Sequence, residues 1–486
     1  MKRNMIRFFK IMYFLSICFA FGLSTFAQNK KWSLDECINY AIEHNVQIKQ
    51  YELEAQSAEI NKQQNIGNFF PTINAEANHS WTISDQMNVT SLTTSVADSK
   101  TFQASNFGIS IGVDIYGGMQ NQNKLVKSRL ALVAARYQVQ KMKEDVALNV
   151  VNSYLQVLFN KELIKTNKVQ LEFDQNQEVK TQELVNAGVV PAGDLLDVQA
   201  TVAAANQRLI ASQNEWVMAK LNLAQLLQID DYENFDISDS DYEIKDELIS
   251  SYTANEIKER AFESLTDIKT AEINVETAEK DVRIAQGAYH PKLRGFYNFG
   301  TNIYYQDRIV GQEILSSTSP IGYVEGTNQT VMQQNRMTVF GGPESFFTQF
   351  DNNKSSTFGL SLSIPIFNGM QVRNSVKLSK LALEQIQNEK EVAVLKLEQL
   401  VFKAYTDTES ALKTFEASEL TLNARERSLE YARERYAVGL INIFELNQNQ
   451  NMYVAAQSDF LKSKYDYIFK TKILEYYFGI PLFKNE

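Results

Sequence analysis

The feature that most constrains this chain is that its two halves repeat each other. Residues 184–197 (LVNAGVVPAGDLLD) read like residues 435–448 (RYAVGLINIFELNQ). At the same offset, residues 106–120 (NFGISIGVDIYGGMQ) match residues 357–371 (TFGLSLSIPIFNGMQ). Repeats with so large a period indicate a duplicated half-structure, because the units of a solenoid are far shorter.

A third matching pair, residues 68–78 and 288–298, has a smaller offset because a later loop is longer in the second half. Each half is predicted to run helix, strand, loop, strand, very long helix, tip and helix. We expect a first repeat over 28–229 and a second over 253–486. The acidic segment 230–252 is predicted to be an irregular, solvated linker between them.

The predicted strands show the clearest alternation of apolar and polar residues. Residues 107–115 and 358–366 are apolar at every second position. A period of two predicts strands with one apolar face. The first β-hairpin is expected over 69–117 and the second over 291–368, with strands of about ten residues. The second would hold a long loop, 305–356, rich in Gln, Thr, Ser and Gly.

A sheet with one apolar face fits either a soluble sandwich or a membrane barrel. Strands of about ten residues can cross a bilayer when tilted. Aromatic residues crowd the predicted strand ends, as the girdles of membrane barrels require: Phe69, Phe70, Tyr116, Tyr304, Tyr305, Phe346, Phe347 and Phe367. These two observations favour the barrel.

Four strands per chain cannot close a barrel alone, because the smallest membrane barrels have about eight. Open strand edges are not tolerated in lipid, so several copies must share one barrel. Two copies would form a narrow barrel filled by side chains, whereas three would form twelve strands with room for a lumen. The residues alone do not choose between them.

Two long stretches without proline, residues 118–187 and 369–438, predict the longest helices. At about 68 residues each they would be roughly 100 Å long, which is typical of coiled coils. Apolar residues such as Val146, Val150 and Tyr154 recur at helical spacing. Shorter helices of about 35 residues are predicted beside them: 33–67, 194–229, 253–288 and 444–478. The fold class is therefore mixed α and β, mainly α.

The N-terminus has the pattern of a signal peptide over residues 1–27. A basic start is followed by an apolar run to about Leu23 and by Thr25-Phe26-Ala27, which resembles a cleavage site. Cys18 lies inside the apolar run after bulky Ile17, which fits poorly with lipid attachment. An exported protein is expected.

The composition excludes several classes of function. The formal net charge is −10, which argues against nucleic acid as a partner. After cleavage only Cys37 would remain, so one mature chain cannot form a disulfide. The histidines are scattered, and no HExxH, GxSxG or phosphate-binding glycine loop occurs. We expect no enzyme, no cofactor and no metal site.

On these features the sequence resembles the TolC family of outer-membrane efflux proteins across nearly the whole mature chain. The first shared feature is the order of strand, long helix and tip in both halves. The others are the two turns after the strands, Tyr116-Gly117-Gly118 and Phe367-Asn368-Gly369, and the tip Tyr436-Ala437-Val438-Gly439-Leu440. The resemblance implies a homotrimer with a twelve-stranded barrel in outer-membrane lipid and a twelve-helix periplasmic α-barrel. It also implies a passive exit duct for efflux or type I secretion, docked to a periplasmic adaptor protein and an inner-membrane pump.

The predicted tips, 187–193 and 438–443, are the candidate functional sites. Gly188 and Gly439 would supply the positive φ that ends each long helix. By resemblance the gate and selectivity residues are Asp194, Asp197, Glu445 and Tyr436, and the residues for the tip turn and adaptor docking are Gly188, Val438, Gly439 and Leu440.

Simpler interpretations stay open for these residues. Asp194 could be a helix N-cap or first-turn acid, with Asp197 one turn later. The sequence also departs from the family at Gln448, which replaces an acid, and at Ile441, where a tethering arginine can occur. The alternative function is a coiled-coil adhesion or binding module in the outer membrane that displays the loop 305–356.

Overall fold

The computed structural model describes residues 31–87, 97–238 and 252–481. The predicted signal peptide, 1–27, lies outside these ranges. The chain forms two compact units. The first, here called the helical unit, comprises Met1–Ala58, Ala131–Val275 and Ile386–Glu486. The second, the sheet unit, comprises Glu59–Leu130 and Glu276–Gln385. Each unit therefore draws on both predicted repeats.

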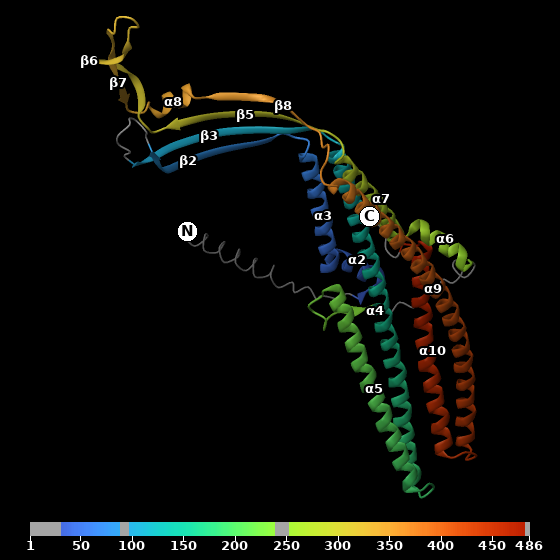
Figure 1. Ribbon diagram of the computed structural model, residues 1–486. Coiled ribbons are helices and arrows are strands. Elements are labelled where there is room, and N and C mark those ends of the chain that lie inside the picture. Colours follow the sequence, from blue (N-terminus) through green and yellow to red (C-terminus); the bar gives the residue numbers. More distant parts are fainter. Residues whose placement is uncertain (1–30, 88–96, 239–251, 482–486) are drawn as a thin grey trace, which may run out of the picture. The chain divides into compact units, whose positions relative to one another are not determined.

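The helices of the two halves match in length pair by pair (Figure 1). The two longest, α4 (Gln120–Asn186) and α9 (Gln371–Ala437), have 67 residues each. The returning helices, α5 (Ala192–Leu227) and α10 (Ile443–Phe478), have 36 residues each. The two halves therefore agree in helix length, and the duplication itself stays a prediction.

The two predicted helices before the strands are wrong as single helices, because each is broken in two. The first pair is α2 (Leu34–His44) and α3 (Val46–Gly67), and the second is α6 (Ala254–Ser264) and α7 (Thr266–Gly287). The breaks fall at Asn45 and Leu265, whose backbones are extended. No proline or glycine marks either break. The Asn45 side chain instead accepts the backbone N–H of Gln47 at 2.9 Å and so starts α3.

The sheet unit contains an antiparallel sheet in the order β2-β3-β5-β8. Its strands are β2 (Thr72–Met87), β3 (Ala97–Gly117), β5 (Lys292–Tyr304) and β8 (Ser355–Ser363). The expected strand length of about ten residues is too short for β2 and β3, which have 16 and 21 residues.

The register places one apolar row across all four strands. Ile73 pairs with Ile111, Ile111 with Tyr297, and Tyr297 with Phe358. Because side chains alternate between faces along a strand, these four share a face. Ile73 and Phe358 are among its large exposed side chains. This face is therefore exposed along the row from Ile73 to Phe358, whereas α8 covers its other end, where Thr301 and Ile303 are buried.

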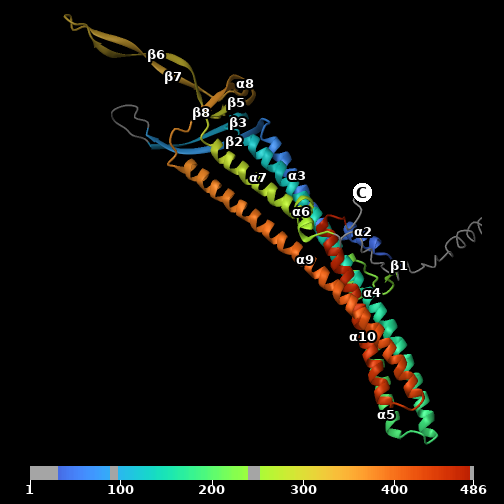
Figure 2. The ribbon, with the colours of Figure 1, turned by 90° about the vertical axis from the view of Figure 1, so that its right-hand side faces the viewer.

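The expectation of a loop over 305–356 is wrong, because much of that segment forms regular structure. It contains the antiparallel hairpin of β6 (Arg308–Tyr323) and β7 (Thr330–Gly341), which Figure 2 shows extended, and the short helix α8 (Phe346–Asn352). The sequence did not predict these strands, because the segment is polar and its apolar residues do not alternate with a period of two. The Gln349 side chain joins α8 to β5 through two hydrogen bonds of 2.9 Å with the Tyr304 backbone.

The main core of the helical unit gathers around α2, α4 and α5. Tyr154 is fully buried there, and its hydroxyl donates to the Trp32 carbonyl at 3.2 Å. Beside it, β1 (Lys31–Trp32) pairs in parallel with β4 (Asp236–Ile237). The expected linker over 230–252 is therefore not wholly solvated, since Phe235 and Ile237 belong to this core.

No helix in the described ranges is long and apolar enough to cross a membrane.

Gly118 lies in the turn between β3 and α4 and has a φ of +66°. A Cβ at this position would overlap the backbone carbonyl of Gly287, the last residue of α7. The two backbones approach so closely because neither residue has a side chain. This contact fixes the start of α4 against the end of α7 within the sheet unit.

We expect Gly118→Ala to destabilise the protein by more than the roughly 1–2 kcal/mol that a left-handed backbone costs a non-glycine residue. Gly188→Ala is the matched variant for the backbone cost alone, because its φ is +72° and an added Cβ would meet no atom within 4 Å. Thermal unfolding in detergent, followed by circular dichroism, measures both. Equal losses in the two variants would show that the Gly287 contact is not a constraint.

Candidate gate at the helical tips

The two tips have the same backbone turn. In the first, Gly188 has a φ of +72°, and the Val189 N–H donates to the Leu184 carbonyl at 2.9 Å. In the second, Gly439 has a φ of +73°, and the Leu440 N–H donates to the Arg435 carbonyl at 2.9 Å. Each glycine is left-handed and lets the last carbonyls of a long helix be satisfied.

The tips are slightly shorter than expected, because α5 begins at Ala192 and α10 at Ile443. Asp194 therefore lies in the first turn of α5, and Pro191 is the N-cap. Glu445 lies in the first turn of α10, where its N–H donates to the Asn442 side chain at 2.9 Å. Both acids gain from the positive end of a helix dipole.

Tyr436 joins the end of α9 to α4. Its half-buried hydroxyl accepts a hydrogen bond from the Gln177 side chain at 3.3 Å. Burial raises the pKa of this hydroxyl, and the nearby charge of Asp194 adds to the rise. The structure therefore brings Asp194 and Tyr436 into electrostatic contact, whereas Asp197 and Glu445 are exposed.

A small apolar cluster packs the beginnings of α5 and α10 against the end of α9. It contains Val198 of α5 together with Leu429, Ala432, Ile441, Ile443 and Leu446, and Tyr436 packs against it. Ile441, where the family can carry an arginine, is 9% exposed. At this position the chain makes an apolar contact in place of an ionic one.

A buried polar face on α4 escaped the sequence analysis. We call it the polar seam, and it comprises Asn160, Asn167, Gln170, Asp174, Gln177 and Thr181, all of which are buried. The spacing of three and four residues places them on one side of the helix. Its polar residues recur every seven positions from 160 to 181, but polar residues in a helix are normally assigned to solvent.

The polar seam contacts the other long hairpin through side-chain amides. The Gln450 amide of α10 donates to the Gln170 side-chain oxygen. Arg433 of α9 donates to the Gln450 oxygen at 3.1 Å, and its guanidinium lies 4.5 Å from the ring centre of Phe173. Two side-chain hydrogen bonds, from Gln450 to Gln170 and from Gln177 to Tyr436, therefore join α4 to the α9–α10 hairpin.

Asp174 lies at the middle of the polar seam and is 2% exposed. One carboxylate oxygen accepts the Gln170 amide at 2.8 Å, while Oδ2 has no hydrogen-bond partner among the described residues. Burial raises the pKa of this carboxyl, against the opposing effects of Gln170 and the Arg208 charge. A buried carboxylate with one free oxygen destabilises the folded state.

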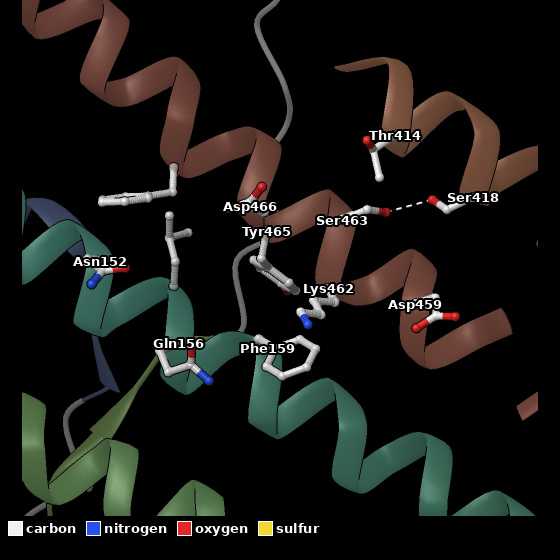
Figure 3. A pocket seen from close by; sticks show the side chains of 12 residues that line it. Asn152, Gln156, Phe159, Thr414, Ser418, Asp459, Lys462, Ser463, Tyr465 and Asp466 are labelled. Carbon is white, nitrogen blue, oxygen red and sulfur yellow. Dashed lines mark hydrogen bonds between the residues drawn. The ribbon is translucent and has the colours of Figure 1, made fainter. Parts of the chain in front are cut away.

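A cavity of about 600 Å³ lies in the helical unit between α4 and the α9–α10 hairpin (Figure 3). Figure 3 shows Gln156 and Phe159 on one side and Asp459 and Lys462 on the other. Its described lining residues include no histidine or cysteine. In the described ranges, no group of three His, Cys, Asp or Glu residues is placed to hold a metal ion.

Comparison with known proteins decides the family. The family model described as "Outer membrane efflux protein" matches residues 37–227 and 259–472, which is most of the chain. The chain belongs to the outer membrane efflux protein family. As a member of this family, it acts in transport at the outer membrane. The two matched stretches fall one in each predicted repeat.

This efflux protein is similar to one curated relative, the alkaline protease secretion protein AprF of Pseudomonas aeruginosa. The two are 25% identical over 140 residues, which cover 29% of this chain and 28% of that relative. The solved structure of VceC from Vibrio cholerae has a TM-score of 0.71 and 14% identity, and covers 92% of this chain and 96% of its own.

The CmeC outer membrane channel of Campylobacter jejuni has a TM-score of 0.73 and 15% identity, covering 93% of this chain and 86% of its own. CusC gives a TM-score of 0.73 at 15% identity, covering 94% and 95%. At these identities the structural matches show a shared, mainly helical fold.

We expect Asp174→Asn to stabilise this efflux protein by about 1 kcal/mol at neutral pH, because the amide keeps the acceptor for Gln170 and removes a buried charge. Since the pKa of Asp174 is raised on folding, the wild-type protein gains stability as the pH falls through that pKa. The advantage of the variant should shrink over the same range.

Thermal unfolding between pH 7.5 and 4 measures this advantage. Asp197→Asn is the matched control, since Asp197 is exposed. An advantage that does not change with pH would contradict the assignment to Asp174.

Proposed function

We propose that this chain is one protomer of a homotrimeric outer-membrane channel, the passive exit duct of an efflux or type I secretion system. The carrying observation is the sheet order β2-β3-β5-β8, which leaves β2 and β8 each paired on one side only within the described strands. Backbone groups in lipid must all be hydrogen-bonded. A sheet with two open edges therefore becomes a membrane structure only when further copies close it.

The side chains of the sheet support a barrel with its apolar face toward lipid. Exposed apolar residues on this face include Ile73, Trp81, Ile109, Phe358, Leu360 and Leu362. Aromatic residues flank both ends of the strands: Phe69, Phe70, Tyr116 and Phe367 at one end, and Tyr304, Tyr305, Phe346 and Phe347 at the other. These two groups match the positions of the aromatic girdles of membrane barrels.

Three copies fit a duct better than two. Twelve strands leave room for a lumen, whereas eight make a barrel filled by side chains. The same three copies would supply twelve helices from α4, α5, α9 and α10 for a periplasmic α-barrel. The family resemblance implies this arrangement, and the pairwise equal helix lengths support it.

The tips would form the gate. In a trimer Asp194 and Glu445 would each occur three times, and rings of like charge select cations. Asp197 and Tyr436 belong to the same proposed gate. The polar seam suits a closure that must open, because its amides can exchange partners for water with less loss than an apolar seam.

The outer surface of the tips is proposed to dock a periplasmic adaptor, which joins an inner-membrane pump. Gly188 and Gly439 form the turns, and the side chains of Val438 and Leu440 are exposed beside the second of them. Exposed apolar side chains gathered at a helical tip fit a partner surface. The name of AprF refers to protease secretion, which fits the secretion branch of this proposal.

The adhesion alternative gains one observation, the β6–β7 hairpin, which exposes Ile309, Ile314 and Phe340 among other apolar residues. A stalk with a binding hairpin would not need a four-stranded sheet whose open edges require further copies. The duct therefore accounts for more of the structure.

We expect the mature protein, purified in detergent from outer membranes, to have the mass of three chains. Multi-angle light scattering, corrected for detergent, measures it. A stable monomer would leave β2 and β8 open in lipid and would overturn the channel.

We expect Asp194→Asn combined with Glu445→Gln to lower cation over anion permeability roughly twofold or more, because two rings of charge are removed. Reversal potentials in planar bilayers under a salt gradient measure this ratio. Glu259→Gln combined with Glu263→Gln, which removes two exposed acids from α6, is the charge-matched control. If the tip variant and the control give the same ratio, the acids at the tips do not set selectivity.

A further inference from the structure

At the junction between sheet and helices, three contacts join the first half of the chain to the second. Gly118 abuts Gly287, the Gln120 amide donates to the Ile284 carbonyl at 2.9 Å, and Lys127 pairs with Asp281 at 2.6 Å. All three join the start of α4 to the end of α7, within the sheet unit. We call this set the junction contact.

The second half repeats the backbone of the junction without its partner. Gly369 and Met370 have φ values of +62° and +64°, against +66° and +60° for Gly118 and Met119. A Cβ added to Gly369 would meet no atom within 4 Å. The same is true of Gly67, which ends α3 as Gly287 ends α7.

The positions correspond one to one. Helix α9 begins 251 residues after α4 (Gln371 against Gln120), and α7 begins 220 residues after α3 (Thr266 against Val46). In each pair the two helices have the same length, 67 or 22 residues. Each half of the junction contact can therefore be transferred residue by residue.

We infer that Gly369 of one copy packs against Gly67 of a second copy of this chain, so that the junction contact recurs between copies. The inference rests on the proposed function, and it adds the residues and register of the interface. The partner at the Gly369 turn is a second copy, because the surface that fits this turn already occurs in the chain, at the end of α3.

Between copies, the residues at the positions of the junction contact differ in chemistry from those inside the chain. The Gln371 amide takes the place of Gln120 and would donate to the Gln64 carbonyl of the second copy. Lys127 and Asp281 become Leu378 and Asn61, so the ion pair is replaced. Leu378 is 67% exposed in the single chain. Covering this leucine removes apolar surface from water, which favours association.

The same transfer fixes the strand register. Ile111 pairs with Tyr297 inside the chain, so Leu362 of β8 should pair with Ala77 of β2 in the second copy. Phe107 pairs with Thr301, which places Phe358 opposite Trp81. These two rings, 82% and 65% exposed, would form a cross-strand aromatic pair. The transferred partners share the apolar face, as a continuous barrel wall requires.

Cysteine cross-linking tests the register. The pair Leu362→Cys with Ala77→Cys should give disulfide-linked dimers and trimers after mild oxidation. In a single sheet, β2 and β8 are opposite edges, so these cysteines cannot meet within one chain. The matched control is Leu362→Cys with Ala75→Cys, on the same strand and face but two residues away. The parent protein, whose Cys37 is fully buried, is the blank.

We expect at least about fivefold more cross-linked product from the Ala77 pair, because disulfides form only within a narrow range of Cβ separation. Equal yields, or more product from the Ala75 pair, would overturn the register. If the particle still contained three chains, the channel would stand and only this inference would fall. A monomeric particle would overturn both.

Gly67→Ala tests the glycine contact separately. Inside one chain an added Cβ at Gly67 meets nothing, and alanine favours a helix, so the fold of the single chain should be kept. Between copies the same Cβ would meet the Gly369 backbone, so the temperature at which the oligomer dissociates in detergent should fall. Gly193→Ala, which also has open space in the chain, is the control. No difference between the two variants would overturn the Gly67–Gly369 contact.

Discussion

The satisfaction of backbone hydrogen bonds at the strand edges is the constraint on which the rest of this structure depends. A four-stranded sheet with an exposed apolar face is unstable in water and incomplete in lipid. The proposed closure by identical copies would meet both constraints, because it would pair the edges and turn the apolar face toward lipid. In that proposal each copy would offer the same kind of junction twice, once at Gly118, where Gly287 of the same chain fills it, and once at Gly369, where it is open.

Much of the fold could be predicted because the strongest patterns were local. The period of two in residues 358–366 predicted β8, although that strand ends at Ser363. The absence of proline between Gly369 and Val438 predicted the long helix α9. The helix breaks at Asn45 and Leu265 could not be read in that way, because neither residue is a conventional helix breaker. They depend on tertiary packing of α2 and α6, and on a cap that forms only in the folded chain.

At the tips the backbone turns could be predicted from the sequence, whereas the buried side-chain contacts could not. The glycines at 188 and 439 were predictable from backbone chemistry, since a reversal needs a left-handed residue. The buried polar residues around Asp174 were not, because a polar residue in a helix is normally assigned to solvent. Their burial follows from the approach of α10, whose Gln450 meets Gln170 from a distant part of the chain. The contact between these helices combines an apolar cluster at the tip with amides above it.

The hairpin of β6 and β7 enters the chain between β5 and β8 without disturbing their register, which runs unbroken from Lys292–Ser363 to Gly300–Ser355. The hairpin can therefore change in length without changing the pairing of β5 with β8. The turn at Gly326, where an added side chain would meet nothing, can accept foreign residues while strand pairing stays intact. That turn offers a position for a peptide tag, through which an antibody could report the membrane topology of the intact assembly on living cells.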